Sequence, residues 1–154
     1  MTHFLFNQLA FVRGQALKAA KDISEETSLI VPNRFNNNIK WNLGHIYLVQ
    51  ERFAFYFIGE EMVLPDSFHD WFGRGTKPAD WQGEVPKTDE LRALLEQQTE
   101  RIERQVGHRM SESTAEPFVT SAGMKLSTVE EFLTFSLYHE GLHTETIKSI
   151  KRFL

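Results

Sequence analysis

Four long segments of this sequence repeat apolar residues at spacings of three and four, and this period constrains the fold more than any other feature. Such stripes are typical of amphipathic helices that bury one face against each other. Strand signals are weak, with one short extended piece expected near residues 118–120. The helical segments cover residues 2–22, 38–58, 88–107 and 128–153.

Residues that favour helix starts stand at the beginning of three segments. The asparagine run at residues 36–38 supplies a cap for the second. Thr88 can cap the third, and Ser127 with Glu130 forms a predicted capping box before the fourth. We therefore predict an all-α chain, with residues 1–154 folded as one four-helix bundle domain.

The connection between the second and third helices, residues 59–87, is long and contains several Gly and Pro residues. A twenty-residue helix is about 30 Å long, so this crossover can return along the whole bundle and let helices two and three run parallel. Its His69, Trp71, Phe72 and Trp81 are candidate packing anchors. We expect an ordered wrap over one end of the bundle, a candidate lid.

Composition excludes several classes of protein. The net charge is −4, which offers no basic footprint for nucleic acid. There is no cysteine, so disulfides, thiolate ligands and a cysteine nucleophile are excluded. The apolar run at residues 53–58 is too short to span a bilayer, and the first residues lack a basic leader. We expect a cytoplasmic protein that acts on a small molecule and binds neither nucleic acid nor a membrane.

Two histidines in the last predicted helix, His139 and His143, stand four residues apart, which places their imidazoles side by side. His45 lies in the middle of the second helix among small and apolar residues. Metal sites in bundles use inward side chains of facing helices, so we predict a metal site of His45, His139 and His143. The alternative is polar packing at a helix seam. Gly44 and Gly141 are expected to allow close helix approach.

Three protein ligands leave one coordination position free, as in catalytic zinc sites. Imidazole donors suit zinc, nickel, iron or copper. The expected cofactor is a divalent metal ion, zinc or nickel ahead of iron or manganese. Of the other histidines, His3 and His108 are expected at the surface, and His69 either at the surface or in packing.

Residues 138–145 contain H-E-x-x-H, a zinc-protease motif. The extended form of that motif requires Gly and His where this chain has Thr146 and Ser149. No later helical segment is available to carry a glutamate ligand instead, so we reject the protease interpretation. Glu140 and Glu145 are candidates for a base or for a group beside the metal, and the alternative for both is an exposed helix charge.

Three stretches carry a resemblance to a known family: NNNIKWNLGHIYLVQERF (residues 36–53), FGRGTKPADW (residues 72–81) and FSLYHEGLHTETI (residues 135–147). Together with a capped last helix after SAGMKLSTVEEF, they resemble the DinB/YfiT-like superfamily. The resemblance implies a four-helix bundle with a long crossover between helices two and three. It also implies a divalent metal held by His45, His139 and His143, and a homodimer, since many members form dimers.

Characterised members of that superfamily include thiol S-transferases that use bacillithiol, mycothiol or glutathione, and a thiol-dependent isomerase. The leading hypothesis is therefore a metal-dependent transferase that uses a low-molecular-weight thiol. The lack of cysteine fits a sulfur nucleophile supplied from outside. One alternative is a metal-dependent hydrolase that activates water. The other is a non-enzymatic stress-response or binding bundle with a structural or vestigial metal. Trp41, one turn before His45, is a candidate pocket wall or core residue.

Overall fold

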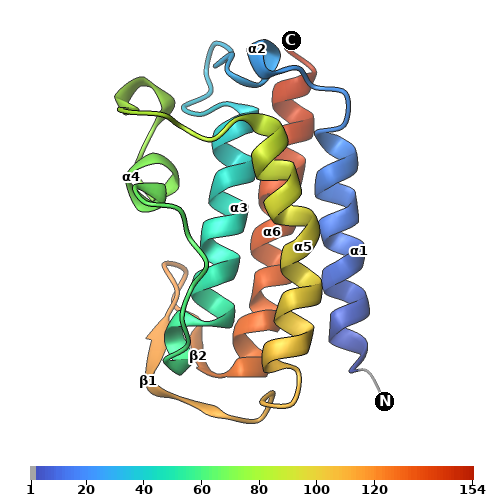
Figure 1. The fold of residues 1–154 in the computed structure, drawn as a ribbon, viewed down its shortest axis with the longest axis vertical. Coiled ribbons are helices and arrows are strands. Elements are labelled where there is room, and N and C mark those ends of the chain that lie inside the picture. Colours follow the sequence, from blue (N-terminus) through green and yellow to red (C-terminus); the bar gives the residue numbers. More distant parts are fainter. Residues whose placement is uncertain (1–2) are drawn as a thin grey trace.

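Four long helices lie side by side within residues 3–154, the part of the chain that the computed structural model describes (Figure 1). The first and second predicted helices are recovered with shorter ends, and residue 2 of the first prediction lies outside the described residues. Helix α6 packs against α1 and α3, and α5 packs against the same two helices. The helices are α1 (Phe4–Ala19), α3 (Ile39–Ala54), α5 (Thr88–Val106) and α6 (Val129–Lys151).

Side-chain caps set the start of three of these helices, α1, α3 and α6. The Asn38 side chain accepts the backbone N–H of Trp41 at 2.7 Å, which confirms the asparagine run as the cap of α3. The cap of α5 is Lys87, and Thr88 is the first helical residue, so the predicted cap is wrong by one position. The hydroxyl of Thr88 donates instead to the Glu25 carboxylate at 2.6 Å.

The capping box of α6 also lies one residue later than predicted. Thr128 accepts the N–H of Glu131 at 3.3 Å, and the Glu131 carboxylate accepts the N–H of Thr128 at 3.2 Å. The expected pair of Ser127 and Glu130 is wrong because the helix begins at Val129, which makes Thr128 the cap and Glu131 the third helical residue. The predicted start of α5 at residue 88 is thus right although its predicted cap is wrong, and the capping box of α6 is right in kind but displaced by one residue.

A short antiparallel ribbon separates α5 from α6, so the described chain is mostly helical but not purely α. Its strands are β1 (Ser113–Val119) and β2 (Lys125–Thr128), with Phe118 opposite Leu126. Only the end of β1 was expected to be extended. Leu126 is fully buried, and the centroid of the Phe118 ring lies 4.9 Å from that of Phe57, which follows the C-terminal end of α3. The ribbon therefore covers the aromatic end of the helical core, and this packing stabilises it.

The crossover runs back along the outer side of α3, so that α3 and α5 point the same way (Figure 1). It contains η1 (Tyr56–Ile58), α4 (Phe68–Phe72) and η2 (Pro78–Asp80), and a further short helix α2 (Glu25–Ser28) precedes α3. Trp71 and Phe72 are buried and Trp81 is partly buried, as expected of packing anchors. The expected wrap over one end is wrong, because α4 packs on the side of α3.

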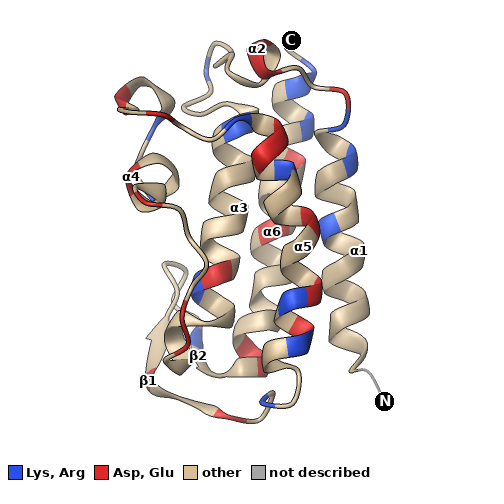
Figure 2. Cartoon of the chain, viewed as in Figure 1, with Lys and Arg blue, Asp and Glu red and all other residues tan. Residues whose placement is uncertain are grey.

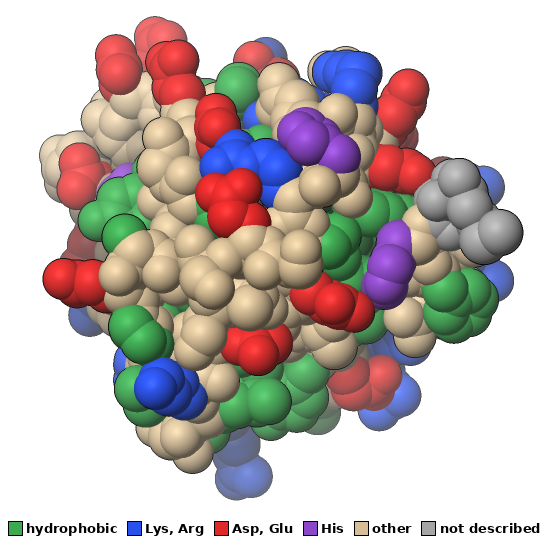
Figure 3. Space-filling view, turned by 90° about the horizontal axis from the view of Figure 1, so that it is seen from below, with side chains coloured by type: hydrophobic (Ala, Val, Ile, Leu, Met, Phe, Trp, Pro, Cys, Tyr) green, Lys and Arg blue, Asp and Glu red, His purple; other side chains and the backbone are tan. Residues whose placement is uncertain are grey.

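Charged residues of both signs are interspersed along the helices (Figure 2), and the view from below shows the same mixture around apolar side chains (Figure 3). Among the described residues, no helix is both long enough and apolar enough to cross a membrane.

Candidate metal centre

Helices α3 and α6 bring the three predicted histidines into one cluster. One ring nitrogen of each of His45, His139 and His143 lies within 4.8 Å of the other two. His45 Nε2 is 3.3 Å from His139 Nε2, and the His143 ring centroid lies 4.7 Å from that of His45 and 4.6 Å from that of His139. The spacing and the chemistry of these donors make a group that could hold one metal ion.

The crossover sets the orientation of His45. Its Nδ1 lies 2.7 Å from the backbone carbonyl oxygen of Phe72. A carbonyl only accepts, so Nδ1–H is the donor and the lone pair of Nε2 is left for the cluster. The indole of Trp41 stacks on the imidazole, with ring centroids 4.5 Å apart and planes 13° apart. The ring of His45 is therefore held on one edge and one face.

Asn42 sets the orientation of His143 in the same way. The Asn42 side-chain amide donates to the backbone carbonyl of Asn38 at 2.8 Å, which turns its oxygen toward the cluster. That oxygen accepts from His143 Nδ1 at 2.8 Å, leaving Nε2 free. Metal-binding histidines commonly use their second nitrogen in this manner. Sequence reasoning missed Asn42, although its place three residues before His45 on the same helix was a usable signal.

The two glycines beside the histidines do not act as predicted. A Cβ at Gly44 would lie 2.4 Å from the ring of Phe72, so Gly44 makes room for the crossover rather than for α6. A Cβ at Gly141 would meet nothing within 4 Å among the described residues, and Gly141 is exposed. Close approach between the two helices therefore does not explain either glycine.

Burial keeps the three imidazoles neutral near pH 7. Desolvation, followed by the neighbouring imidazoles of His143 and His45, lowers the pKa of His139 to about 2. Desolvation, followed by His45, lowers the pKa of His143 to about 4. Desolvation also lowers the pKa of His45, although its bond to Phe72 acts in the opposite direction. The neutral imidazole is the form that binds metals.

Glu140 is neither a base at the cluster nor an exposed charge. Its side chain is buried and pairs with Arg13 of α1, with Arg13 Nε 2.6 Å from Glu140 Oε1. Arg13, expected at the margin of its helix face, is 2% exposed and also donates to the Leu95 carbonyl and to Gln98 Oε1. Glu145 is exposed, which is the alternative expected for it. Sequence spacing gave no signal for the buried ion pair.

The remaining histidines lie away from the cluster. His3 and His108 are exposed, as expected; His69 is exposed too, so it is not the packing anchor that was one of its two expected roles. His3 caps α1 by accepting the backbone N–H of Leu5 at 3.3 Å.

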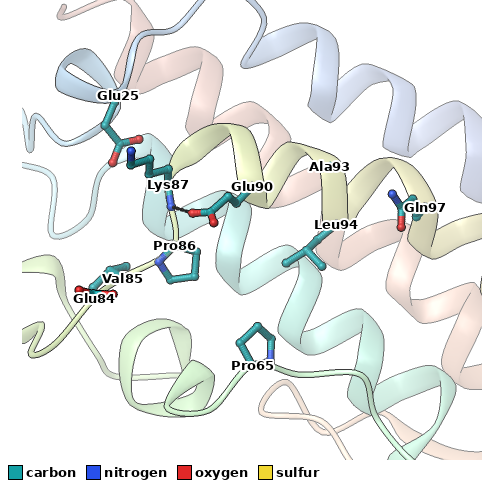
Figure 4. A pocket seen from close by; sticks show the side chains of 10 residues that line it. All are labelled: Glu25, Pro65, Glu84, Val85, Pro86, Lys87, Glu90, Ala93, Leu94 and Gln97. Atoms are coloured by element: carbon teal, nitrogen blue, oxygen red, sulfur yellow. Dashed lines mark hydrogen bonds between the residues drawn. The ribbon is translucent and has the colours of Figure 1, made fainter.

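A hollow of about 860 Å³ lies between the crossover and the start of α5, and no histidine of the cluster lines it (Figure 4). Two of its carboxylates are already engaged. Glu25 accepts from Lys40 at 2.6 Å, and Glu90 accepts the N–H of Lys87 at 2.6 Å. Burial raises the pKa of Glu25, but the hydrogen bonds from Lys40 and Thr88 together outweigh it and lower that pKa to about 2. Polar side chains that line this hollow are thus already bonded within the protein, and the histidine cluster is not part of it.

A family model described as the DinB superfamily matches residues 8–147, a range that includes all three histidines. No curated protein matches the chain.

Proposed function

The chain belongs to the DinB superfamily, and we propose that it is a metal-dependent enzyme in which His45, His139 and His143 hold a divalent ion. In this proposal the long helices form the four-helix bundle of the family. One observation carries the metal assignment. His45 and His143 each bond through Nδ1 to a fixed acceptor, so that their Nε2 atoms remain available beside His139.

Polar packing at a helix seam explains this geometry less well. Largely buried imidazoles without partners are costly, and the contact of 3.3 Å between Nε2 of His45 and Nε2 of His139 is a hydrogen bond only when His139 carries its proton on Nε2, because His45 carries its own on Nδ1. A bound cation would give these lone pairs a common partner.

The donor set favours a catalytic ion over a structural one. Within the described residues, the group contains three histidines and no carboxylate. Three ligands leave a position for a small molecule. When bound, a divalent ion supplies a Lewis acid that lowers the pKa of a coordinated thiol or water.

We further propose transfer of the sulfur of a low-molecular-weight thiol to an electrophilic substrate. A sulfur–carbon bond forms, the bond to the leaving group breaks, and the thiol proton passes to solvent. The chain has no cysteine of its own, so the nucleophile comes from the cofactor. The pairing of Glu140 with Arg13 also removes the carboxylate that a zinc protease would use as its base, which makes hydrolysis the weaker candidate.

The test uses protein purified without a histidine tag and loaded with zinc or nickel. Turnover of monochlorobimane is measured with glutathione, bacillithiol and mycothiol, above the uncatalysed rate. We expect a thiol-dependent rate that disappears on chelation and in His139→Ala, and that persists in His69→Ala, whose side chain is exposed. Thiol-independent turnover lost on chelation would instead establish the hydrolase. Metal binding without turnover of any substrate would favour the non-enzymatic alternative.

A further inference from the structure

A second hollow, of about 720 Å³, lies between the β1–β2 turn and the first turns of α6. Ligand pockets commonly have volumes of about 300–1,000 Å³. Its apolar lining comes from both sides: Ala122 and Met124 from the turn, and Phe135 and Tyr138 from the helix. Met124 is 56% and Tyr138 60% exposed, so both present apolar surface to a ligand. We call these four residues the apolar wall.

The apolar wall continues to the metal centre. Phe135 stands four residues before His139, which places the two side chains on one helix face about 6 Å apart along the axis. The ring of Phe53 links them, with its centroid 6.0 Å from that of Phe135 and 6.3 Å from that of His139. Leu142, 50% exposed, is the next neighbour of His139 on this face. No histidine lines the hollow, but one of its lining residues, Phe135, is joined to the histidine cluster through Phe53.

Charge around the hollow selects against anions. None of the lining residues, all within the described chain, is Lys or Arg. The carboxylate of Glu131 is occupied by the backbone N–H groups of Ser127 and Thr128. Glu130 remains at the rim, and its partner His3 is 3.4 Å away in a half-exposed pair. The local charge is therefore negative.

From this continuity and this charge we propose that the hollow binds the aromatic part of an uncharged or cationic electrophilic substrate. Aromatic rings and a thioether favour an aromatic ligand through stacking and sulfur–ring contacts. An anionic thiol cofactor must then approach the histidines from another side. The role of the hollow as a substrate site rests on the proposed transferase reaction. The binding of an aromatic molecule there does not depend on it.

The binding test needs neither metal nor thiol. Titration calorimetry measures the Kd of three probes of similar shape: 1-naphthylmethanol, 1-naphthylmethylamine and 1-naphthaleneacetate. We expect the alcohol and the amine to bind and the acid to bind more weakly. Tyr138→Ala is expected to raise the Kd of the alcohol about fivefold, because part of the apolar contact is lost. Phe11→Ala is the matched control, since Phe11 is 67% exposed on α1.

Met124→Ser tests the opposite side of the hollow, and it keeps the test decisive if Tyr138→Ala does not fold. An unchanged Kd in the folded variants, an equal effect of Phe11→Ala, or preferred binding of the acid would each overturn the proposal.

A kinetic readout separates this proposal from the transferase itself. In Tyr138→Ala we expect a higher KM for 1-chloro-2,4-dinitrobenzene with kcat nearly kept, and an unchanged KM for iodoacetamide, which has no ring. Probe binding without any thiol-dependent turnover would overturn the transferase and leave the hollow in place. If turnover occurs and the KM of each electrophile is the same in the variant as in the wild type, the proposed role of the hollow is overturned and the transferase is not.

Discussion

The backbone carbonyl of Phe72 accepts a hydrogen bond from Nδ1 of His45 at 2.7 Å. The ring of Phe72 occupies the space that the missing side chain of Gly44 leaves open. A second bond, from Trp41 Nε1 to Thr76 Oγ1 at 2.9 Å, ties the crossover to the preceding turn of α3. The crossover thus orients a candidate metal ligand.

Replacing Gly44 with Ala tests this arrangement. The new Cβ would lie 2.4 Å from the Phe72 ring, so α4 must shift and the bond to His45 must lengthen. We expect a loss of stability of about 1–3 kcal/mol and weaker zinc binding. Gly141→Ala is the matched control, because it adds a methyl group in open space and should stabilise the helix by up to about 1 kcal/mol. Urea unfolding and zinc titration measure both, and equal behaviour of the two variants would contradict the assigned role of Gly44.

Asn42→Ala removes the acceptor of His143 Nδ1. Loss of such a partner typically lowers metal affinity about 10–100-fold, and we expect a change of this size. Asn42→Asp keeps an oxygen acceptor at the same place and should retain most of the affinity. Competition with a chromophoric chelator gives the constants. An affinity in Asn42→Ala equal to that of wild type would show that this bond does not support the site.

Glu140→Ala leaves the Arg13 guanidinium buried without its carboxylate. Breaking a buried ion pair in this way costs about 3–5 kcal/mol, and adding Arg13→Met should recover part of the loss. Glu145→Ala, at an exposed position of the same helix, should stay within about 0.5 kcal/mol of wild type. Urea unfolding at pH 7 compares the variants. A Glu140→Ala variant as stable as Glu145→Ala would argue against the buried pair.

The metal-free protein should lose stability in acid. The folded protein holds the pKa of His143 at about 4 and that of His139 at about 2, below the ordinary value of 6.5. At pH values between each lowered pKa and 6.5, the unfolded chain binds more protons than the folded protein does. The stability of the fold therefore rises with pH and levels off above 6.5. Each group contributes at most about 1.4 kcal/mol per pH unit. Urea unfolding from pH 7 to pH 4 should give a shallower slope for His139→Gln than for wild type; parallel slopes would contradict the lowered pKa.

Local sequence patterns were sufficient to predict the four long helices and the candidate metal ligands. Helical period and capping residues depend on neighbours in the chain, so the four long segments were found with ends wrong by a few residues. The four-residue spacing of His139 and His143, with a histidine in the centre of another helix, indicated the cluster. The ribbon was mostly missed: residues 118–120 were expected to be extended, but the partner strand with Leu126 depends on packing against the helical core, which no local pattern reports.

By itself the sequence determined which segments are helical and which imidazoles can share one face, because both follow from backbone geometry over a few residues. Only the tertiary structure decided what surrounds them. The carbonyl that orients His45 lies 27 residues away along the chain, and the partner of Glu140 lies 127 residues away. Such contacts depend on how helices and crossover pack in space, and packing brings together groups that no spacing along the chain relates.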